Sequence, residues 1–201
     1  MTTIVFDSKI LAADSQRSRS TGTGDHARHC PSCKEEIHMT AGFVEKLRVP
    51  SKPVKFRDER IIAVATAGAV NVTAPVAHAL FAGLDLEPSF ALIKASFTEA
   101  SGMPGGTVVI LTKTKFYEIK STQKQGFTIK EITKFPYTAG TGSQVARVGM
   151  DMLGLNAAQA VQLARQYDKA TGGEVRYIAR RGGVESIGVD AKIETNFSRG
   201  E

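Results

Sequence analysis

The sequence predicts an α+β fold, a four-layer αββα sandwich in which two sheets lie face to face and each carries a helix pair outside. Strand-like segments, either alternating or continuously apolar, come in three groups along the 201 residues. Between these groups lie two pairs of segments with apolar residues four apart, which is typical of amphipathic helices. The order strands, two helices, strands, two helices, strands suits two sheets with outer helices, and the length suits a single domain over residues 1–201.

The first sixteen residues predict a β-hairpin at the very start of the chain. Residues 3–6 are β-branched and aromatic, residues 7–9 form a short polar turn, and residues 10–13 form an apolar return strand ending at Asp14. Thr2 is small enough for the initiator Met to be removed. Its freed α-amine, with a pKa of about 8, could then take the proton of its own hydroxyl. Thr2 would thus be nucleophile and base in one residue.

Composition and charge indicate an ordinary soluble protein with a cytoplasmic location. Hydrophobic residues make up 42% and charged residues 23%, and no apolar run is long enough for a membrane span. No basic-then-apolar signal peptide is visible. The formal net charge is +6, but the Lys and Arg residues are scattered without a basic helix. Nucleic-acid binding is therefore not expected.

Residues 17–41 are interpreted as an inserted loop that departs in character from the rest of the chain. A Cys-x-x-Cys turn with a His five residues later has the spacing of half a tetrahedral zinc site. A structural zinc would stabilise a loop too short for its own core. The alternatives are a loop with reduced thiols and a redox motif, although no thioredoxin-like strand and helix surround it. The expected ligands are Cys30, Cys33, His38 and His26, with His29 as the alternative to His26.

The middle of the chain predicts strands followed by two helices. Residues 43–49 favour a strand, and residues 61–68 form a continuous apolar run that predicts a buried strand ending at Gly68. Apolar residues spaced four apart from Val72 onward predict the first helix, and Pro88 is expected to start the second.

The second half predicts more strands, two further helices and two last strands. A Gly-rich turn over residues 137–143 is expected before the third helix, with Ser143 as a candidate N-cap, and Asn156 is expected to cap the fourth. Glycines after Thr171 would end that helix. The expected strands cover residues 107–112, 115–120, 126–130, 175–179 and 184–189.

Six features of these segments together resemble the proteasome β-type peptidases, most of all the bacterial HslV peptidase and its phage-encoded relatives. The likeness rests on Thr-Thr-Ile-Val after Met1, an apolar strand closing on Asp, a Gly-x-x-x-Lys segment, a strand ending in Ala-Gly, a Gly-Thr-Gly turn, and Asp-x-x-Thr-Gly after the fourth helix. It covers most of the chain apart from residues 17–38 and 50–60. It implies an N-terminal nucleophile (Ntn) hydrolase.

The resemblance implies a role for each matching residue. Thr2 would attack the peptide carbonyl, Asp14 and Lys46 would tune it, and the N–H of Gly68 would stabilise the oxyanion. The residues that would hold the terminus are Thr141 (where the family usually has Ser), Asp168 and Thr171. Lys52 competes with Lys46 for the role of active-site lysine, but Pro53 directly after it fits poorly in a central strand.

The function that follows is a threonine-type endopeptidase acting on peptides or unfolded proteins, without a catalytic cofactor. The resemblance also implies a homo-oligomeric ring and an ATPase partner. Two alternatives stay open. One is a catalytically inactive structural or assembly subunit with the same fold, and the other is an Ntn amidohydrolase that cleaves a small amide.

Overall fold

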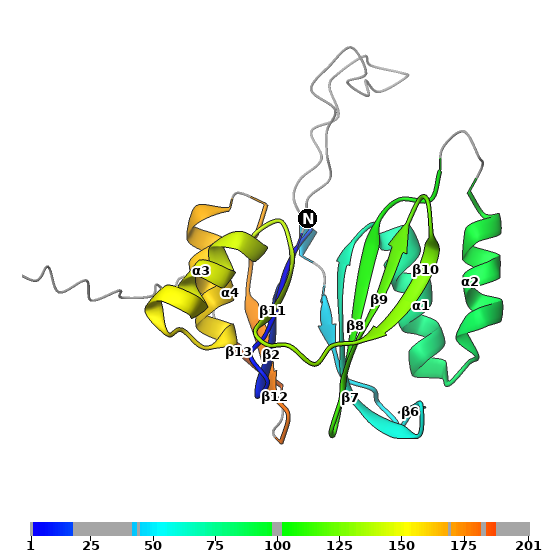
Figure 1. Ribbon diagram of the computed structural model, residues 1–201, viewed down its shortest axis with the longest axis horizontal. Helices are drawn as coiled ribbons and strands as arrows, with labels where there is room; N and C mark the ends of the chain where they lie inside the picture. The colour runs from blue at the N-terminus through cyan, green and yellow to red at the C-terminus, as the bar shows by residue number, and fades with distance from the viewer. Residues whose placement is uncertain are drawn as a thin grey trace, which may run out of the picture.

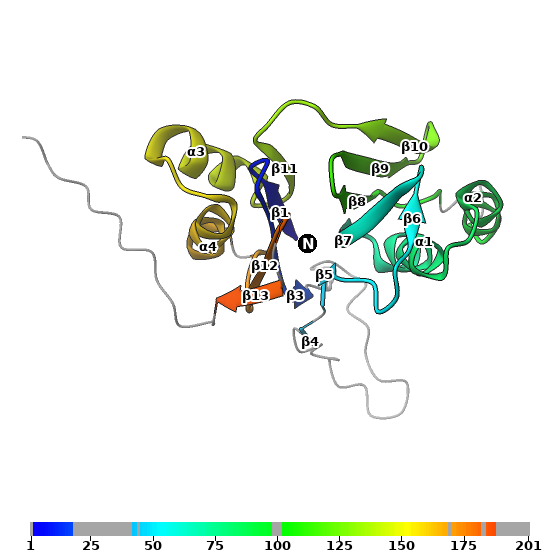
Figure 2. The ribbon, with the colours of Figure 1, turned by 90° about the horizontal axis from the view of Figure 1, so that it is seen from below.

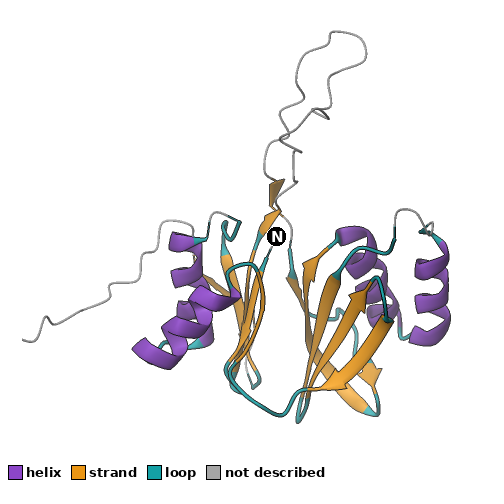
Figure 3. Ribbon diagram, turned by 45° about the horizontal axis from the view of Figure 1, so that its top comes forward, coloured by secondary structure: helices purple, strands orange, loops and turns teal. Residues whose placement is uncertain are grey.

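Two antiparallel sheets lie face to face at the centre of the computed structural model, and a helix pair covers the outer face of each (Figures 1 and 3). The structure describes residues 2–17, 42–43, 45–97, 102–168, 170–181 and 184–187. The predicted αββα sandwich is confirmed, and the helix pairs follow in the expected order along the chain.

The first sheet contains the predicted N-terminal hairpin and carries the start of the chain. Asp7 closes the hairpin turn, because its Oδ1 accepts the N–H groups of Lys9 at 2.8 Å and Ile10 at 2.7 Å. In sheet order the strands are β11 (Tyr137–Gly140), β1 (Thr3–Phe6), β2 (Ile10–Asp14), β12 (Val175–Ala179) and β13 (Val184–Ile187). Residues 137–140, expected as part of a turn, instead form an edge strand that pairs with β1.

The second sheet is built around the ten-residue strand β7, which spans the molecule from one end to the other. In sheet order its strands are β10 (Gly126–Glu131), β9 (Phe116–Thr122), β8 (Gly106–Thr112), β7 (Glu59–Gly68) and β5 (Leu47–Arg48). Two further short pairings lie outside this order. They are β6 (Lys55–Phe56) with the start of β7, and β3 (Gln16–Arg17) with β4 (Gly42–Phe43).

One strand expectation is wrong: residues 43–49 do not form a continuous strand. The chain leaves β4 at Phe43 and enters β5 only at Leu47. Lys46 lies between them and directs its side chain into a buried ion pair with Asp14.

The helices are α1 (Val70–Ala82), α2 (Leu86–Ala95), α3 (Ser143–Leu153) and α4 (Ala157–Tyr167). Asn156 caps α4 as expected, in a reciprocal capping box with Gln159. Helix α2 begins at Leu86 rather than Pro88, because the Asp85 side chain accepts the N–H of Glu87 and caps the first turn. Ser143 is the first residue of α3 and not its N-cap, a position that Gly142 occupies.

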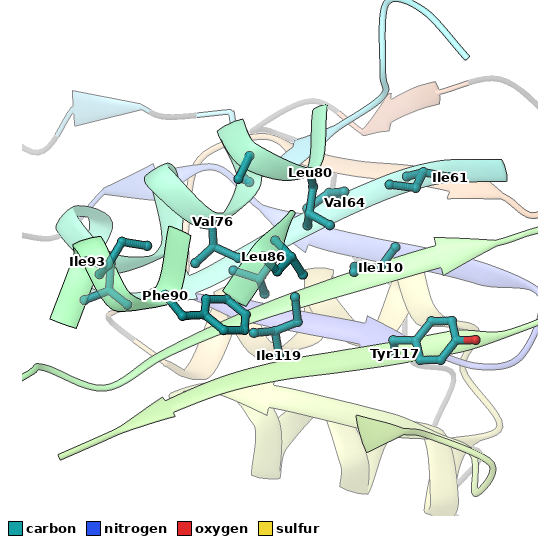
Figure 4. Close-up of a cluster of buried hydrophobic side chains, with 14 of the residues drawn as sticks. Ile61, Val64, Val76, Leu80, Leu86, Phe90, Ile93, Ile110, Tyr117 and Ile119 are labelled. Atoms are coloured by element: carbon teal, nitrogen blue, oxygen red, sulfur yellow. The ribbon is translucent and has the colours of Figure 1, made fainter. Parts of the chain in front are cut away.

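Apolar side chains fill the three spaces between the four layers. Figure 4 shows the cluster between the second sheet and helices α1 and α2, which includes Val76, Leu80, Phe90, Ile110 and Ile119. A second cluster lies between the sheets, and a third lies under α3 and α4. No helix among the described residues has both the length and the apolar character needed to cross a membrane.

Candidate functional site

A buried ion pair joins the end of β2 to the segment before β5. Lys46 Nζ lies 3.0 Å from Asp14 Oδ2 and 3.1 Å from Asp14 Oδ1, and the two residues are only 6% and 1% exposed. Asp14 also accepts main-chain N–H groups from Thr3 at 2.8 Å and Gly172 at 3.1 Å. Such a network holds a carboxylate and an ammonium in one geometry away from bulk water.

Burial and the neighbouring Asp14 act in opposite directions on the pKa of Lys46. Burial lowers the pKa of Lys46 below its usual value, although the charge and the hydrogen bonds of Asp14 act against that shift. An ammonium in this position is more acidic than an ordinary surface lysine and acts on its neighbours with little screening.

Thr2 lies at the entrance to β1, next to this pair. Along β1, Ile4 and Phe6 point into the space between the sheets while Val5 points toward the helices. The alternation of a strand therefore places Thr2 on the same side as Ile4, toward the interface between the sheets. Figure 2 shows this beginning of β1 facing β7 across the interface.

The turn before α3 holds the main chain of Thr2. The N–H of Thr141 donates to the carbonyl oxygen of Thr2 at 3.0 Å. Gly140 has a φ of 94°, and a Cβ at this position would lie 1.6 Å from the same carbonyl oxygen. The close approach of the two segments thus requires glycine.

A chain of hydroxyl groups runs from Thr3 to Asp168. Asp168 Oδ2 accepts hydrogen bonds from the hydroxyls of Thr141 and Thr171, each at 2.7 Å. Because the Thr171 hydroxyl donates to Asp168, it accepts from Thr3 Oγ1 at 2.5 Å. Thr3 Oγ1 in turn accepts the N–H of Gly142 at 3.1 Å. The N-terminal strand, the α3 turn and the end of α4 are thereby tied together.

Asp168 is held as a carboxylate by this arrangement. Its partial burial would raise the pKa, but the hydrogen bonds from Thr171, Thr141 and the N–H of Ala170 outweigh that effect. The pKa of Asp168 therefore lies below its usual value.

Gly68 ends β7 on the strand next to Lys46. The carbonyl oxygen of Lys46 accepts the N–H of Thr66 at 3.0 Å, two residues before Gly68. Gly68 has a φ of 92°, and a Cβ there would lie 2.7 Å from the carbonyl oxygen of Gly105. The backbone conformation and the close contact with Gly105 are sufficient to require glycine at position 68, whether or not its N–H takes part in catalysis.

Of the two candidate lysines, only Lys46 lies beside Asp14. Lys52 is exposed and lines a cleft near the beginning of β7. The structure therefore brings together Asp14, Lys46 and the start of β1, and separately joins Thr141, Asp168 and Thr171 through Thr3.

The sequence assigned no role to Thr3, Gly140, Gly142 or Gly172, all of which contact the site, although the three glycines belong to the Gly-Thr-Gly and Asp-x-x-Thr-Gly motifs. The two successive threonines, Thr2 and Thr3, could have indicated a role for Thr3. Since neighbouring side chains in a strand point to opposite faces, the second Thr must serve the helix side when the first faces the interface. The glycine contacts depend on how distant segments meet, which local pattern does not reveal.

The predicted zinc ligands Cys30, Cys33, His38 and His26 lie outside the described residues, as does the alternative His29. Within the part that the structure describes, no group of three or more His, Cys, Asp or Glu residues could hold a metal ion. The zinc site therefore stays a prediction.

Solved structures with this fold include Anbu proteins. The Anbu complex from Pseudomonas aeruginosa, described as a helical assembly, matches with a TM-score of 0.59 and 13% identity over 95% of this chain and 88% of that one. Anbu (ancestral β-subunit) from Yersinia bercovieri matches with a TM-score of 0.58 and 13% identity over 94% and 88%.

Anbu from Hyphomicrobium sp. strain MC1 matches with a TM-score of 0.55 and 12% identity over 95% of this chain and 89% of that one. No protein-family model matches the sequence, and no curated protein matches it either. The chain therefore has the Anbu, proteasome β-like fold, at low sequence identity.

Proposed function

We propose that this chain is an N-terminal threonine endopeptidase that uses Thr2, after removal of Met1, to hydrolyse peptide bonds. One observation carries the proposal. Asp14 Oδ1 accepts hydrogen bonds from both Lys46 Nζ and the N–H of Thr3, so one oxygen links a buried amine to the first peptide of the processed chain. A nucleophile next to such a group gains acidity.

In the first half of the reaction, Thr2 Oγ1 attacks the carbonyl carbon of the substrate and forms an ester. The hydroxyl proton passes to the α-amine of Thr2, directly or through a water, and from there to the leaving amine as the C–N bond breaks. Lys46, as an ammonium, lowers the pKa of the hydroxyl and the amine. The N–H of Gly68 stabilises the oxyanion, which in comparable sites is worth about 3–4 kcal/mol.

In the second half, water attacks the ester carbon while the α-amine takes its proton. The acid product leaves as the proton returns to Thr2 Oγ1. Thr141, Asp168 and Thr171 do not touch the reacting atoms in this scheme. They are positioning residues, because they fix the carbonyl of Thr2 and the side chain of Thr3.

The direct test compares hydrolysis of a fluorogenic peptide panel by wild type, Thr2→Ala and Thr2→Ser. Alanine and serine both permit removal of Met1, so the variants differ in the hydroxyl alone. We expect Thr2→Ala to be inactive and Thr2→Ser to retain activity. Equal activity of Thr2→Ala and wild type would refute the mechanism.

The same assay separates the alternative functions. A processed wild-type chain that cleaves no peptide in the panel would indicate a structural or assembly subunit. Thr2-dependent cleavage of small amides without cleavage of peptides would indicate an amidohydrolase.

We also infer self-association through the outer face of α3 and α4. Val148, Met152 and Tyr167 are 56%, 78% and 72% exposed there. The P. aeruginosa Anbu complex is itself a helical assembly. Sedimentation should show an assembly that Met152→Glu weakens and Leu92→Glu, an equally exposed change on α2, leaves intact. A ring and an ATPase partner stay predictions.

A further inference from the structure

A cleft of about 730 Å³ opens between the two sheets at the end of the molecule opposite Thr2. One wall comes from the second sheet, through the loop after β5, the start of β7 and the β8–β9 turn. The other comes from the end of β12. The lining includes Lys52, Arg60, Lys113, Arg180, Arg181 and Ile178.

The register of the strands separates this cleft from the Thr2 site. In β12, Val175 pairs with Asp14, whereas Ala179, next to Ile178, pairs with Ile10 at the other end of β2. In β7, the cleft begins at Arg60 and Ile61 while Gly68 closes the strand at the Thr2 end. Seven residues of strand span roughly 23 Å. Figure 1 shows the N-terminus and β6 at opposite ends of the sheets.

The cleft concentrates positive charge. Its lining includes five cationic side chains and no acidic one. Among the described residues, none of these five cations is within ion-pair distance of a carboxylate. Glu59 acts electrostatically on Arg180, but its two oxygens accept hydrogen bonds from the hydroxyls of Thr112 and Thr114.

Arg180 shows that this charge is costly. Its Nε is buried without a hydrogen-bond partner within the described chain, and its guanidinium lies over the ring of Phe6 at 5.1 Å. Burial lowers the pKa of Arg180. A bound anion would supply the missing partner and relieve the repulsion among the five cations.

The rest of the lining is mostly apolar and includes Val49, Pro50, Ile61, Ile62 and Ile178. Its volume is that of a typical small-molecule site, and a lining that combines cations with apolar side chains suits a ligand with several adjacent negative charges on an organic body. We propose that this cleft is a second ligand site, which binds a small molecule bearing adjacent phosphate groups.

Isothermal titration calorimetry with tripolyphosphate, adenosine triphosphate and adenosine tests the proposal on the full-length chain. The cleft variant is Lys52→Gln/Lys113→Gln, and the matched control is Lys94→Gln/Lys124→Gln. All four lysines are exposed, and each pair removes two charges. We expect the cleft variant to weaken tripolyphosphate binding about tenfold or more, since two close charges are lost. The control should change it less than twofold.

The nucleotide arm identifies the source of the phosphates. Tighter binding of adenosine triphosphate than of tripolyphosphate indicates a phosphate ester with an organic body, and equal binding indicates a bare polyphosphate. Absence of binding by both phosphate compounds, or equal weakening in the two double variants, would overturn the proposal. Because calorimetry needs no peptidase assay, this result is independent of the chemistry at Thr2.

Discussion

Lys46 and Asp14 form a buried ion pair with 3.0 Å between Nζ and Oδ2, and the same carboxylate binds the main chain of Thr3. The two residues come from segments on either side of residues 17–41. A charge pair is costly to bury unless it is well hydrogen-bonded. The Lys46–Asp14 pair lies against the beginning of β1, where it can act on a nucleophile at Thr2.

The first prediction separates the catalytic and structural parts of this pair. Lys46→Met should abolish most peptidase activity, by about 10²-fold or more. It should also destabilise the fold by about 3–5 kcal/mol, because it leaves Asp14 buried without its cation. Asp14→Asn/Lys46→Met should recover only part of that stability and stay inactive, because the one oxygen of Asn accepts only one of the two main-chain N–H groups that Asp14 holds. Peptide hydrolysis and thermal unfolding measure both effects, with exposed Lys52→Met as the control. An active Lys46→Met variant would contradict the assignment.

The second prediction concerns the approach of the α3 turn to Thr2. Gly140→Ala would place a methyl group 1.6 Å from the Thr2 carbonyl oxygen, so the turn must move. We expect loss of activity and a clear drop in melting temperature. Gly126→Ala is the matched control. Its φ of 70° is also left-handed but nothing lies within 4 Å of the added Cβ. That variant should lose only about 1–2 kcal/mol of stability and stay active. Similar behaviour of the two variants would count against the contact.

The third prediction is a pH dependence of stability at Asp168. Its pKa is lower in the folded chain than its ordinary value of 3.8. The ionised group therefore contributes stability that is fully present above pH 3.8 and is lost as the pH falls through the folded pKa. The difference in unfolding free energy between wild type and Asp168→Asn should be constant near neutral pH and shrink below pH 3.8. A difference that grows on acidification would show the opposite sign.

Much of this site could be predicted from the sequence because its residues stand at the ends of recognisable elements. Asp14 closes an apolar strand, Gly68 ends a buried run, and Asp168 follows a capped helix. The choice of Lys46 over Lys52 rested on Pro53, and the structure places Lys46 beside Asp14.

What could not be predicted depends on contacts between distant segments. Residues 137–140 carry turn-like glycine, yet they become a strand because β1 offers them a free edge. The expected strand over residues 43–49 is interrupted between β4 and β5, where Lys46 pairs with the buried Asp14, a residue 32 positions away in the sequence. Gly172 reaches Asp14 across a sequence separation of 158 residues, and nothing near it in sequence indicates that contact.

The fourth prediction concerns zinc in the segment of residues 17–41. Metal analysis of the purified chain should find one zinc per chain, and Cys30→Ser/Cys33→Ser should remove it. Peptide hydrolysis should persist in that variant, because the proposed chemistry needs no metal. A zinc-free wild-type protein with both thiols intact would end the hypothesis.

The most direct test of the central claim is the intact mass of the chain with and without a peptide epoxyketone. This probe forms a covalent ring with both the hydroxyl and the amine of an N-terminal threonine. We predict a chain that lacks Met1 and gains the mass of one probe, with no gain in Thr2→Ala. A processed wild-type chain that hydrolyses peptides but takes up no probe, or one that hydrolyses them while keeping Met1, would contradict the account.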